Sequence, residues 1–424
     1  MLDIRLVRDN PDAVRAGLRA KKSDPAAVDA LLEMDAERRR LTTETEELKR
    51  RKNELSKEIP VKAKAGEDIE PLKAESREIG AKMGEGEARL KAINAEQSDL
   101  LLRLPNLPHE STPLGTSEAD NKIVRTWGEK PTFDFQPKTH WDLGKDLGIL
   151  DLERGAKISG SGFIVLKGAA ARLERALAAW MLDIHTRRNG YTEIAPPYLV
   201  SRTTMTGTGQ LPKMEEDMYH VTEEDMFLIP TAEVPVTNLH AGEILDASAV
   251  PTRYVALSPC FRREAGSYGK EVRGITRIHQ FNKVEMVQFT APEKSYEAHE
   301  ELTSHATGLL EALGLHYRVA LLCSGDISFA AAKCYDLEVW APGMGLWLEV
   351  SSCSNFEDFQ ARRANIRFRR EAGAKPEFVH TLNGSGLALP RLLIALLETY
   401  QQADGSIALP PVLHAWAGTE RIGP

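Results

Sequence analysis

The stretch that decides the predicted fold is YVALSPCFRRE, residues 254–264. It is followed by a basic, glycine-bearing loop, AGSYGKEVRGITRIHQ (265–280), and then by FNKVEMVQF (281–289). Two runs rich in β-branched and aromatic residues on either side of a loop predict two antiparallel strands, 254–264 and 281–289. Because side chains alternate along a strand, Arg262 and Glu264 should share one face of the first strand. By the same rule, one face of the second strand carries Phe281, Lys283, Glu285, Val287 and Phe289.

This hairpin would present a guanidinium group, carboxylates and an aromatic ring together. An arginine can bind a phosphate or a carboxylate through two hydrogen bonds, and a ring beside it can stack on a base. The alternative is a structural ion pair between sheet residues with Phe281 in the core, and the spacing alone favours neither interpretation.

A third segment supports the binding interpretation. NGSG (383–386) permits close approach of a backbone or ligand, and Pro390 then starts an apolar helix with Arg391 in its first turn. A helix N-terminus disfavours a cation, so Arg391 indicates a bound anion. The alternative is an ordinary surface arginine.

The rest of the chain beyond about residue 115 predicts the α+β class. Short strand-like runs alternate with helical segments such as 169–188 and 391–400, which is typical of a largely antiparallel sheet flanked by helices. The sequence has no GxxxxGK[ST] motif and no GxGxxG between a strand and a helix, so neither a P-loop nor a Rossmann site is indicated.

The N-terminal quarter has a different pattern, that of a long helical hairpin. Residues 10–22 predict a short helix capped by Asn10, and a long helix should follow and end at Pro60, with a second one beginning after Pro71. Apolar residues recur at heptad spacing in both long helices: Met34, Leu41, Leu48 and Leu55, then Leu72 and Ile79, Met83 and Leu90, Ile93 and Leu100. Two helices of about 30 residues would form an antiparallel arm on the order of 45 Å long.

The pattern alone leaves the arm's role open. It could be a dimerisation coiled coil or spacer, or it could reach a large partner, since the first helix and the tip carry many basic residues. The run LPNLP (104–108) breaks the second helix and predicts a boundary between a domain over 1–108, with the arm at about 27–104, and a domain over 109–424.

The composition is that of an ordinary globular protein. Of 424 residues, 42% are hydrophobic and 27% charged, and 62 acidic against 54 basic residues give a net charge of −8, which excludes a uniformly basic nucleic-acid coat but not a local basic surface. No long apolar run or signal peptide is present, which predicts a cytoplasmic protein without a membrane partner. Cys260, Cys323, Cys334 and Cys353 lie far apart and are expected to be reduced core thiols, with neither disulfides nor zinc.

Several quoted motifs together resemble the class II aminoacyl-tRNA synthetases, and among these the seryl-tRNA synthetases of the bacterial type. RRNGYTEIAPP (187–197) is similar to class motif one, FRRE (261–264) with HQFNKVE (279–285) to motif two, and NGSGLALPR (383–391) to motif three. Seryl-specific stretches are also matched: GTGQLP (207–212), PTAE (230–233), YDLEVW (335–340), EVSSCSN (349–355) and DFQARR (358–363). The likeness extends over nearly the whole chain, including the arm.

The resemblance implies a class II antiparallel sheet and a set of site residues. It implies an ATP site made of Arg262, Arg263, Glu264, Ile278, Phe281, Glu349, Val350, Ser351, Ser352 and Arg391. It implies a serine site made of Thr231, Ala232, Glu233, Arg262, Glu285, Asn383 and Ser385. Within these sets Phe281 and Arg391 would enclose adenine, Arg262 would hold the α-phosphate and the serine carboxylate, and Glu349 would bind Mg²⁺. The implied catalytic residues are Arg262, Glu349 and Arg391, and His279 is expected to make a structural hydrogen bond.

The same resemblance implies an activity and partners. Serine would be activated with ATP to seryl-adenylate and transferred to tRNA(Ser), with tRNA(Sec) left open, by a homodimer formed through motif one. The arm would hold the tRNA, and Arg50, Arg51 and Lys52 are the expected contacts. The competing interpretations are a non-catalytic RNA-binding paralogue, an amino-acid ligase that charges a carrier protein, and an antibiotic-resistant duplicate. Arg263, Gly162 and Cys334 stand where this family commonly has other residues.

Overall fold

The computed structural model describes residues 1–265 and 273–423. Contacts divide the chain into two compact units, Leu2–Pro105 and Asn106–Pro424 together with Met1. Among the described residues, no helix combines the length and the apolar character that crossing a membrane requires.

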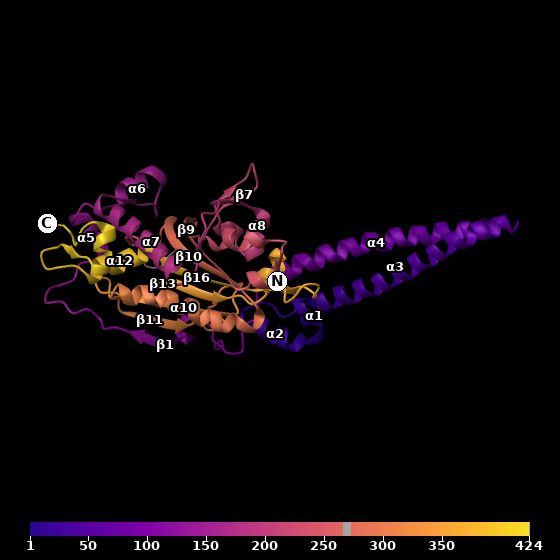
Figure 1. Ribbon diagram of the computed structural model, residues 1–424, viewed down its shortest axis with the longest axis horizontal. Coiled ribbons are helices and arrows are strands. Elements are labelled where there is room, and N and C mark those ends of the chain that lie inside the picture. The colour runs from indigo at the N-terminus through magenta and orange to yellow at the C-terminus, as the bar shows by residue number, and fades with distance from the viewer. Residues whose placement is uncertain (266–272, 424) are drawn as a thin grey trace. The chain divides into compact units, whose positions relative to one another are not determined.

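The N-terminal unit is helical. Its elements are α1 (Ile4–Asp9), α2 (Pro11–Ala20), α3 (Ala27–Lys64) and α4 (Glu70–Arg103). Figure 1 shows α3 and α4 side by side, and the ion pairs Arg51–Glu75 (2.8 Å) and Arg89–Glu37 (3.0 Å) join them in antiparallel order. The predicted antiparallel arm is therefore confirmed, with helices of 38 and 34 residues.

Two predicted helix ends were wrong. Pro60 does not stop α3, which continues to Lys64, and α4 begins at Glu70 and includes Pro71 in its first turn. The fixed φ of proline is itself helical, and the carbonyl of Ser56 that loses its usual N–H donor lies on an exposed part of the helix, where water can replace that donor. Proline at the start of α4 has no N–H that the helix would use.

The second unit contains a large, mostly antiparallel sheet, which confirms the predicted α+β class. The strand order is β1 (Lys122–Trp127), β11 (Tyr317–Leu321), β12 (Lys333–Ala341), β13 (Leu346–Asn355), β16 (His380–Ala388), β10 (Gln280–Thr290), β9 (Thr252–Phe261) and β4 (Thr192–Glu193). In this sheet only the β4–β9 pair is parallel among the described strands. Shorter strands form small sheets around it: β2 (Leu150–Asp151), β3 (Val165–Leu166), β5 (Leu199–Ser201), β6 (His220–Val221), β7 (Met226–Leu228), β8 (Ile244–Asp246), β14 (Arg367–Arg369), β15 (Glu377–Phe378), β17 (Ile407–Ala408) and β18 (Arg421–Ile422).

The second unit also contains helices. They are α5 (His140–Asp146), α6 (Leu152–Ser159), α7 (Ala169–Arg187), α8 (Arg202–Thr208), α9 (Glu233–Thr237), α10 (Ser295–Ala312), α11 (Phe359–Ala364), α12 (Leu389–Thr399) and α13 (His414–Ala417). The main core joins α7, α10 and α12, which Figure 1 labels, to one face of the sheet. Helices α9 and α11 contribute to a smaller core on the other face.

The strand alternation of β10 separates the two faces. Val284 and Met286 are fully buried in the main core, whereas Lys283 and Glu285 line a cavity on the opposite face. The glycines of β16 have a packing reason on the helix side. A Cβ on Gly384 would lie 2.4 Å from Leu302 of α10, and one on Gly386 would lie 2.7 Å from His185 of α7. The NGSG stretch thus brings two helices close behind the strand, which aims Ser385 into the cavity.

Candidate active site

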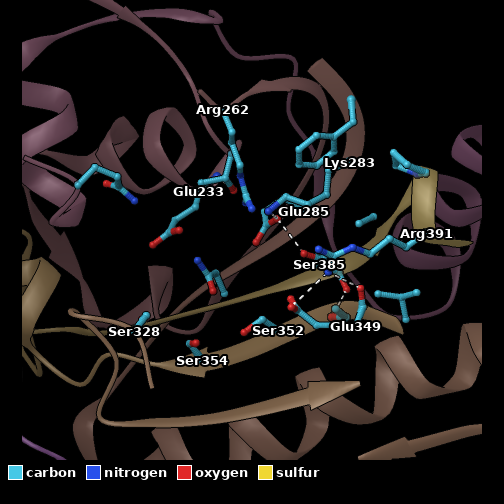
Figure 2. A pocket seen from close by; sticks show the side chains of 18 of the residues that line it. Glu233, Arg262, Lys283, Glu285, Ser328, Glu349, Ser352, Ser354, Ser385 and Arg391 are labelled. Carbon is cyan, nitrogen blue, oxygen red and sulfur yellow. Dashed lines mark hydrogen bonds and ion pairs between the residues drawn. The ribbon is translucent and has the colours of Figure 1, made fainter. Parts of the chain in front are cut away.

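The cavity on the open face of the sheet has a volume of about 420 Å³. Its floor is made by β10, β13 and β16, and its walls come from the segments after β7 and β9, the end of α8 and the start of α12. Figure 2 shows carboxylates and guanidinium groups pointing into it from both sides. The sequence-predicted residues that line it are Thr231, Glu233, Arg262, Glu264, Ile278, Phe281, Glu285, Glu349, Val350, Ser351, Ser352, Asn383, Ser385 and Arg391.

A buried ion pair lies on the cavity floor. Lys283 Nζ lies 2.6 Å from Glu285 Oε2, and the two side chains are 9% and 2% exposed. The Ser385 hydroxyl donates to the same carboxylate at 3.4 Å, an interaction drawn in Figure 2. Glu285 and Ser385 are directly opposite each other in the pairing of β10 with β16, which brings their side chains together. This corner therefore offers a carboxylate and a hydroxyl to a small polar ligand.

A second carboxylate, Glu233, lies at the start of α9. It is buried, and its Oε1 accepts a 2.6 Å hydrogen bond from Gln360 Nε2. Burial, reinforced by the charge of Glu285, raises the pKa of Glu233 to about 7, while hydrogen bonds from Gln360 and Asn383 act in the opposite direction. The two carboxylates outnumber the single lysine that pairs with Glu285, so this part of the cavity suits a ligand that carries a positive charge.

Arg262 lies where β9 ends. Its guanidinium is 5.2 Å from the centre of the Phe281 ring, and its Nε donates a long hydrogen bond to the Pro230 carbonyl at 3.4 Å. The predicted strand was too long, because β9 ends at Phe261 and Glu264 has a left-handed backbone (φ 52°). The turn after the strand, rather than strand alternation, brings Arg262 and Glu264 to one cavity. Glu264 pairs there with Arg277 at 3.2 Å.

Arg391 lies in the first turn of α12, as predicted, and faces Glu349 of β13. Its Nη1 donates to the Glu349 backbone carbonyl at 2.8 Å and lies 3.3 Å from the Glu349 carboxylate. Its Nε donates to the Thr276 carbonyl at 3.3 Å. A carboxylate is thus the anion beside this helix N-terminus, and Arg391 remains a quarter exposed to the cavity.

The chemistry around Glu349 suits a hard cation shared with a ligand. Burial and the nearby charge of Glu349 raise the pKa of Asp336 well above its ordinary value, and Ser352 donates a hydrogen bond to the same carboxyl group. Oxygen donors of this kind are those that Mg²⁺ prefers, usually with phosphate and water as further ligands. Among residues 1–265 and 273–423, no group of three or more His, Cys, Asp or Glu side chains could hold a metal by itself.

Some predicted site residues lie outside the cavity lining. Arg263 donates to the backbone carbonyl of Glu216 at 3.1 Å, and Ala232 is buried in the smaller core. His279 makes a 2.9 Å hydrogen bond with the Arg262 carbonyl and one of 3.1 Å with the Tyr219 hydroxyl. Residues 266–272 of the predicted basic loop lie outside the described residues.

The basic residues of the arm differ in their surroundings. Arg51 is held by Glu75, with Glu54 and Glu58 nearby, whereas Arg50 is exposed. Lys52 approaches Gly80 of α4.

Two residues that shape the cavity were not predicted from the sequence. Lys283 was placed on the right strand face but given no role, although its i, i+2 spacing from Glu285 was a signal for a pair. Gln360 was quoted inside a motif, yet nothing in the sequence indicated that it contacts Glu233, because 127 residues separate them. Cys334 is buried beneath the cavity, with its Sγ 3.1 Å from Ser352 Oγ.

Comparisons with known proteins agree with this architecture over the whole chain. The seryl-tRNA synthetase N-terminal domain family matches residues 1–108, and the tRNA synthetase class II core domain family (G, H, P, S and T) matches 216–400. A serine--tRNA ligase of Geobacter sulfurreducens is 54% identical over 424 residues, and one of Syntrophobacter fumaroxidans 53% over 423, each covering all of both chains. The crystal structure of seryl-tRNA synthetase from Pyrococcus horikoshii complexed with ATP superposes with a TM-score of 0.96 at 40% identity, also covering all of both chains. This chain therefore belongs to the seryl-tRNA synthetase family of class II synthetases.

Proposed function

We propose that this protein activates L-serine with ATP to form seryl-adenylate and transfers the seryl group to tRNA(Ser). The observation that carries the proposal is the cavity itself. It combines the buried Glu285–Ser385 corner with two arginines, Arg262 and Arg391, that line the same cavity. Full-length identity of 53–54% to serine--tRNA ligases supports the same activity.

The polar groups of the cavity match the three polar groups of serine. Glu285 and Ser385 would bind the hydroxyl, Arg262 the carboxylate, and Glu233 with Thr231 and Asn383 the ammonium group. Ala232 would shape the segment between Thr231 and Glu233 from within the core. Alanine lacks the hydroxyl and would leave the buried polar groups unpaired, so it should be rejected strongly, whereas threonine is excluded only by the size of the cavity.

ATP would occupy the opposite side of the cavity. Adenine would lie between Phe281 and Arg391 with Glu264 near its edge, and Arg262 would contact the α-phosphate. The ATP site would be completed by Ile278, Glu349, Val350, Ser351 and Ser352, whereas Arg263 lies outside the cavity lining. Glu349, beside Ser352, would hold Mg²⁺, which when bound would neutralise phosphate charge.

The reaction needs alignment and charge stabilisation rather than a protein nucleophile. In the first step a serine carboxylate oxygen attacks the α-phosphorus and the bond to the β-phosphate breaks, so pyrophosphate leaves. In the second step a ribose hydroxyl of the tRNA attacks the seryl carbonyl, and AMP leaves. Arg262 and Arg391 would stabilise the negative charge that develops at phosphorus, and the cavity would hold the reacting oxygen in line.

The two predicted domains would divide the work. Residues 1–108 would bind tRNA through the arm, and 109–424 would catalyse both steps as a cytoplasmic homodimer formed through residues 187–197. Arg50, Arg51 and Lys52 would contact tRNA phosphates. Because Arg51 already pairs with Glu75, Arg50→Ala should lower the slope of log affinity against log salt by about 0.9 per lost phosphate contact, with the hairpin intact by circular dichroism. An unchanged slope in the triple variant Arg50→Ala/Arg51→Ala/Lys52→Ala would remove these contacts from the proposal.

Charging of purified tRNA(Ser) with labelled serine tests the whole proposal. Seryl-tRNA should form with the wild type, and Arg262→Ala should abolish its formation without loss of tRNA binding. Binding of tRNA without charging would indicate a non-catalytic paralogue, and transfer of an amino acid to a carrier protein instead would indicate the ligase alternative.

A further inference from the structure

Gln360 is a buried glutamine whose amide is fully engaged behind the cavity. It lies on α11, is 1% exposed and does not line the cavity. Its Nε2 donates to Glu233 Oε1 at 2.6 Å and to the Thr208 backbone carbonyl at 3.2 Å, and its Oε1 accepts from the Thr381 hydroxyl at 2.7 Å. Three segments that bound the cavity, the end of α8, α9 and β16, therefore meet at one side chain.

The partners fix which way this amide points. The Thr208 carbonyl can only accept a hydrogen bond, so the amide nitrogen must face it and Glu233 together. Turning the amide over would place its oxygen against two acceptors. In the observed orientation the Thr381 hydroxyl donates to the amide oxygen, and this bond keeps the amide nitrogen facing Glu233.

Glu233 depends on this amide because, among the described residues, no cation forms an ion pair with it. The charged groups that face it are Glu285 and Lys283, both on β10, and Lys283 is paired with Glu285 at 2.6 Å. The neutral donors to Glu233 are Gln360 on α11 and Asn383 on β16. A short hydrogen bond from a neutral donor to a carboxylate supports the ionised form without cancelling its charge.

We propose that Gln360 is a positioning residue of the amino-acid site, which holds the Glu233 carboxylate in the place where it receives the ammonium group of serine. The inference rests on the proposed function, since it requires Glu233 to contact the substrate. Gln360 itself touches neither serine nor ATP and acts only through Glu233.

The positioning role has a signature in the pH dependence. An ammonium group binds the ionised carboxylate, so in the wild type the KM for serine should rise as pH falls through about 7, where Glu233 takes up a proton. Loss of the Gln360 donors raises the pKa of Glu233 further, because the hydrogen bond that lowers it is gone. The rise in KM should therefore begin at a higher pH in a variant without the amide.

The central test compares Gln360→Met, which keeps the length of the side chain, with Gln401→Met as a matched control. Gln401 is 2% exposed and its amide also makes three hydrogen bonds, to Lys138 and Glu398; it follows the C-terminal end of α12, whose N-terminal end lines the cavity. Gln360→Met should raise the KM for serine roughly 10- to 100-fold, the effect of a hydrogen bond to a charged group, and leave the KM for ATP within about twofold. Gln401→Met should lower thermal stability and leave both KM values unchanged. Equal KM values for serine in Gln360→Met and the wild type, with an unmoved pH profile, would overturn the inference.

Gln360→Glu provides a second test that preserves shape. Two buried carboxyl groups about 2.6 Å apart cannot both ionise, so the pair would share one proton at pH 6 and still at pH 8. The shared proton would keep Glu233 from binding the ammonium group, so the KM for serine should be raised and should lose the wild-type change near pH 7. A KM for serine that follows the wild-type pH profile would overturn the inference even if Gln360→Met fails to fold.

Glu233→Gln separates this inference from the proposed function. If it leaves the KM for serine unchanged, the assignment of Glu233 to the substrate fails and the inference fails with it. If it raises that KM while both Gln360 variants do not, only the positioning role is wrong.

Discussion

The buried Lys283–Glu285 pair allows a test in which variants recover stability without recovering activity. Lys283→Met removes a lysine that, among the described residues, is the only one lining the cavity, and leaves Glu285, 2% exposed, near the second buried carboxylate of Glu233. Breaking a buried ion pair by removing one partner costs about 3–5 kcal/mol, since the remaining charge stays buried without compensation. Glu285→Gln should cost a similar amount by leaving Lys283 unpaired.

The double variant Lys283→Met/Glu285→Gln removes both charges, and its free energy of unfolding should recover to within about 1–2 kcal/mol of the wild type. Urea unfolding followed by tryptophan fluorescence measures all four proteins. Serine-dependent pyrophosphate exchange should stay low in the double variant despite its recovered stability, because the carboxylate that binds the hydroxyl is gone. A loss below about 1 kcal/mol for Lys283→Met, or no recovery in the double variant, would refute the reasoning.

Three further predictions follow from particular contacts. Gly162 has φ +80°, and a Cβ there would lie 2.2 Å from the His279 ring, so Gly162→Ala should lower the free energy of unfolding in urea by about 2 kcal/mol or more. Because His279 supports the Arg262 backbone, the KM for ATP should also rise. An unchanged KM for ATP would show that His279 does not affect ATP binding through Arg262. The pKa of Glu233 is raised in the folded state from 4.5 to about 7, so its contribution to stability is present below pH 4.5 and is lost as pH rises through about 7. Across that interval the free energy of unfolding of Glu233→Gln should rise by up to about 3 kcal/mol relative to that of the wild type. A relative gain in the variant's free energy of unfolding as the pH falls would contradict this prediction. Burial raises the pKa of the Cys260 and Cys334 thiols and raises that of Cys353 to about 12. A thiol reagent should therefore modify these three residues only after denaturation. Rapid labelling of any of them in the native protein would contradict their burial.

The sequence predicted the elements that depend on local periodicity. The heptad spacing of apolar residues predicted the antiparallel arm. The alternation of residues 281–289 predicted that Lys283 and Glu285 share a face of β10, which is the cavity side. Helix ends were less predictable, because a proline such as Pro60 is tolerated where the freed carbonyl meets water.

Long-range contacts explain what the sequence could not predict. The contact of Gln360 with Glu233 depends on how α11 packs against α8 and β16, which no local pattern encodes. The left-handed turn at Glu264 likewise depends on its surroundings, yet it decides how Arg262 and Glu264 reach one cavity. Arg391 was predicted to lie beside a bound anion, and in the structure its partner is the Glu349 carboxylate on β13, a contact that the sequence did not indicate.

The most direct test of the central claim is amino-acid-dependent exchange of pyrophosphate into ATP, measured without tRNA for serine, threonine, glycine and alanine. The account predicts exchange that is strongest with serine, weak with threonine and nearly absent with alanine and glycine, because only serine pairs the Glu285–Ser385 corner within the available volume. Exchange that is greatest with glycine or alanine, or no exchange with any of the four, would contradict it.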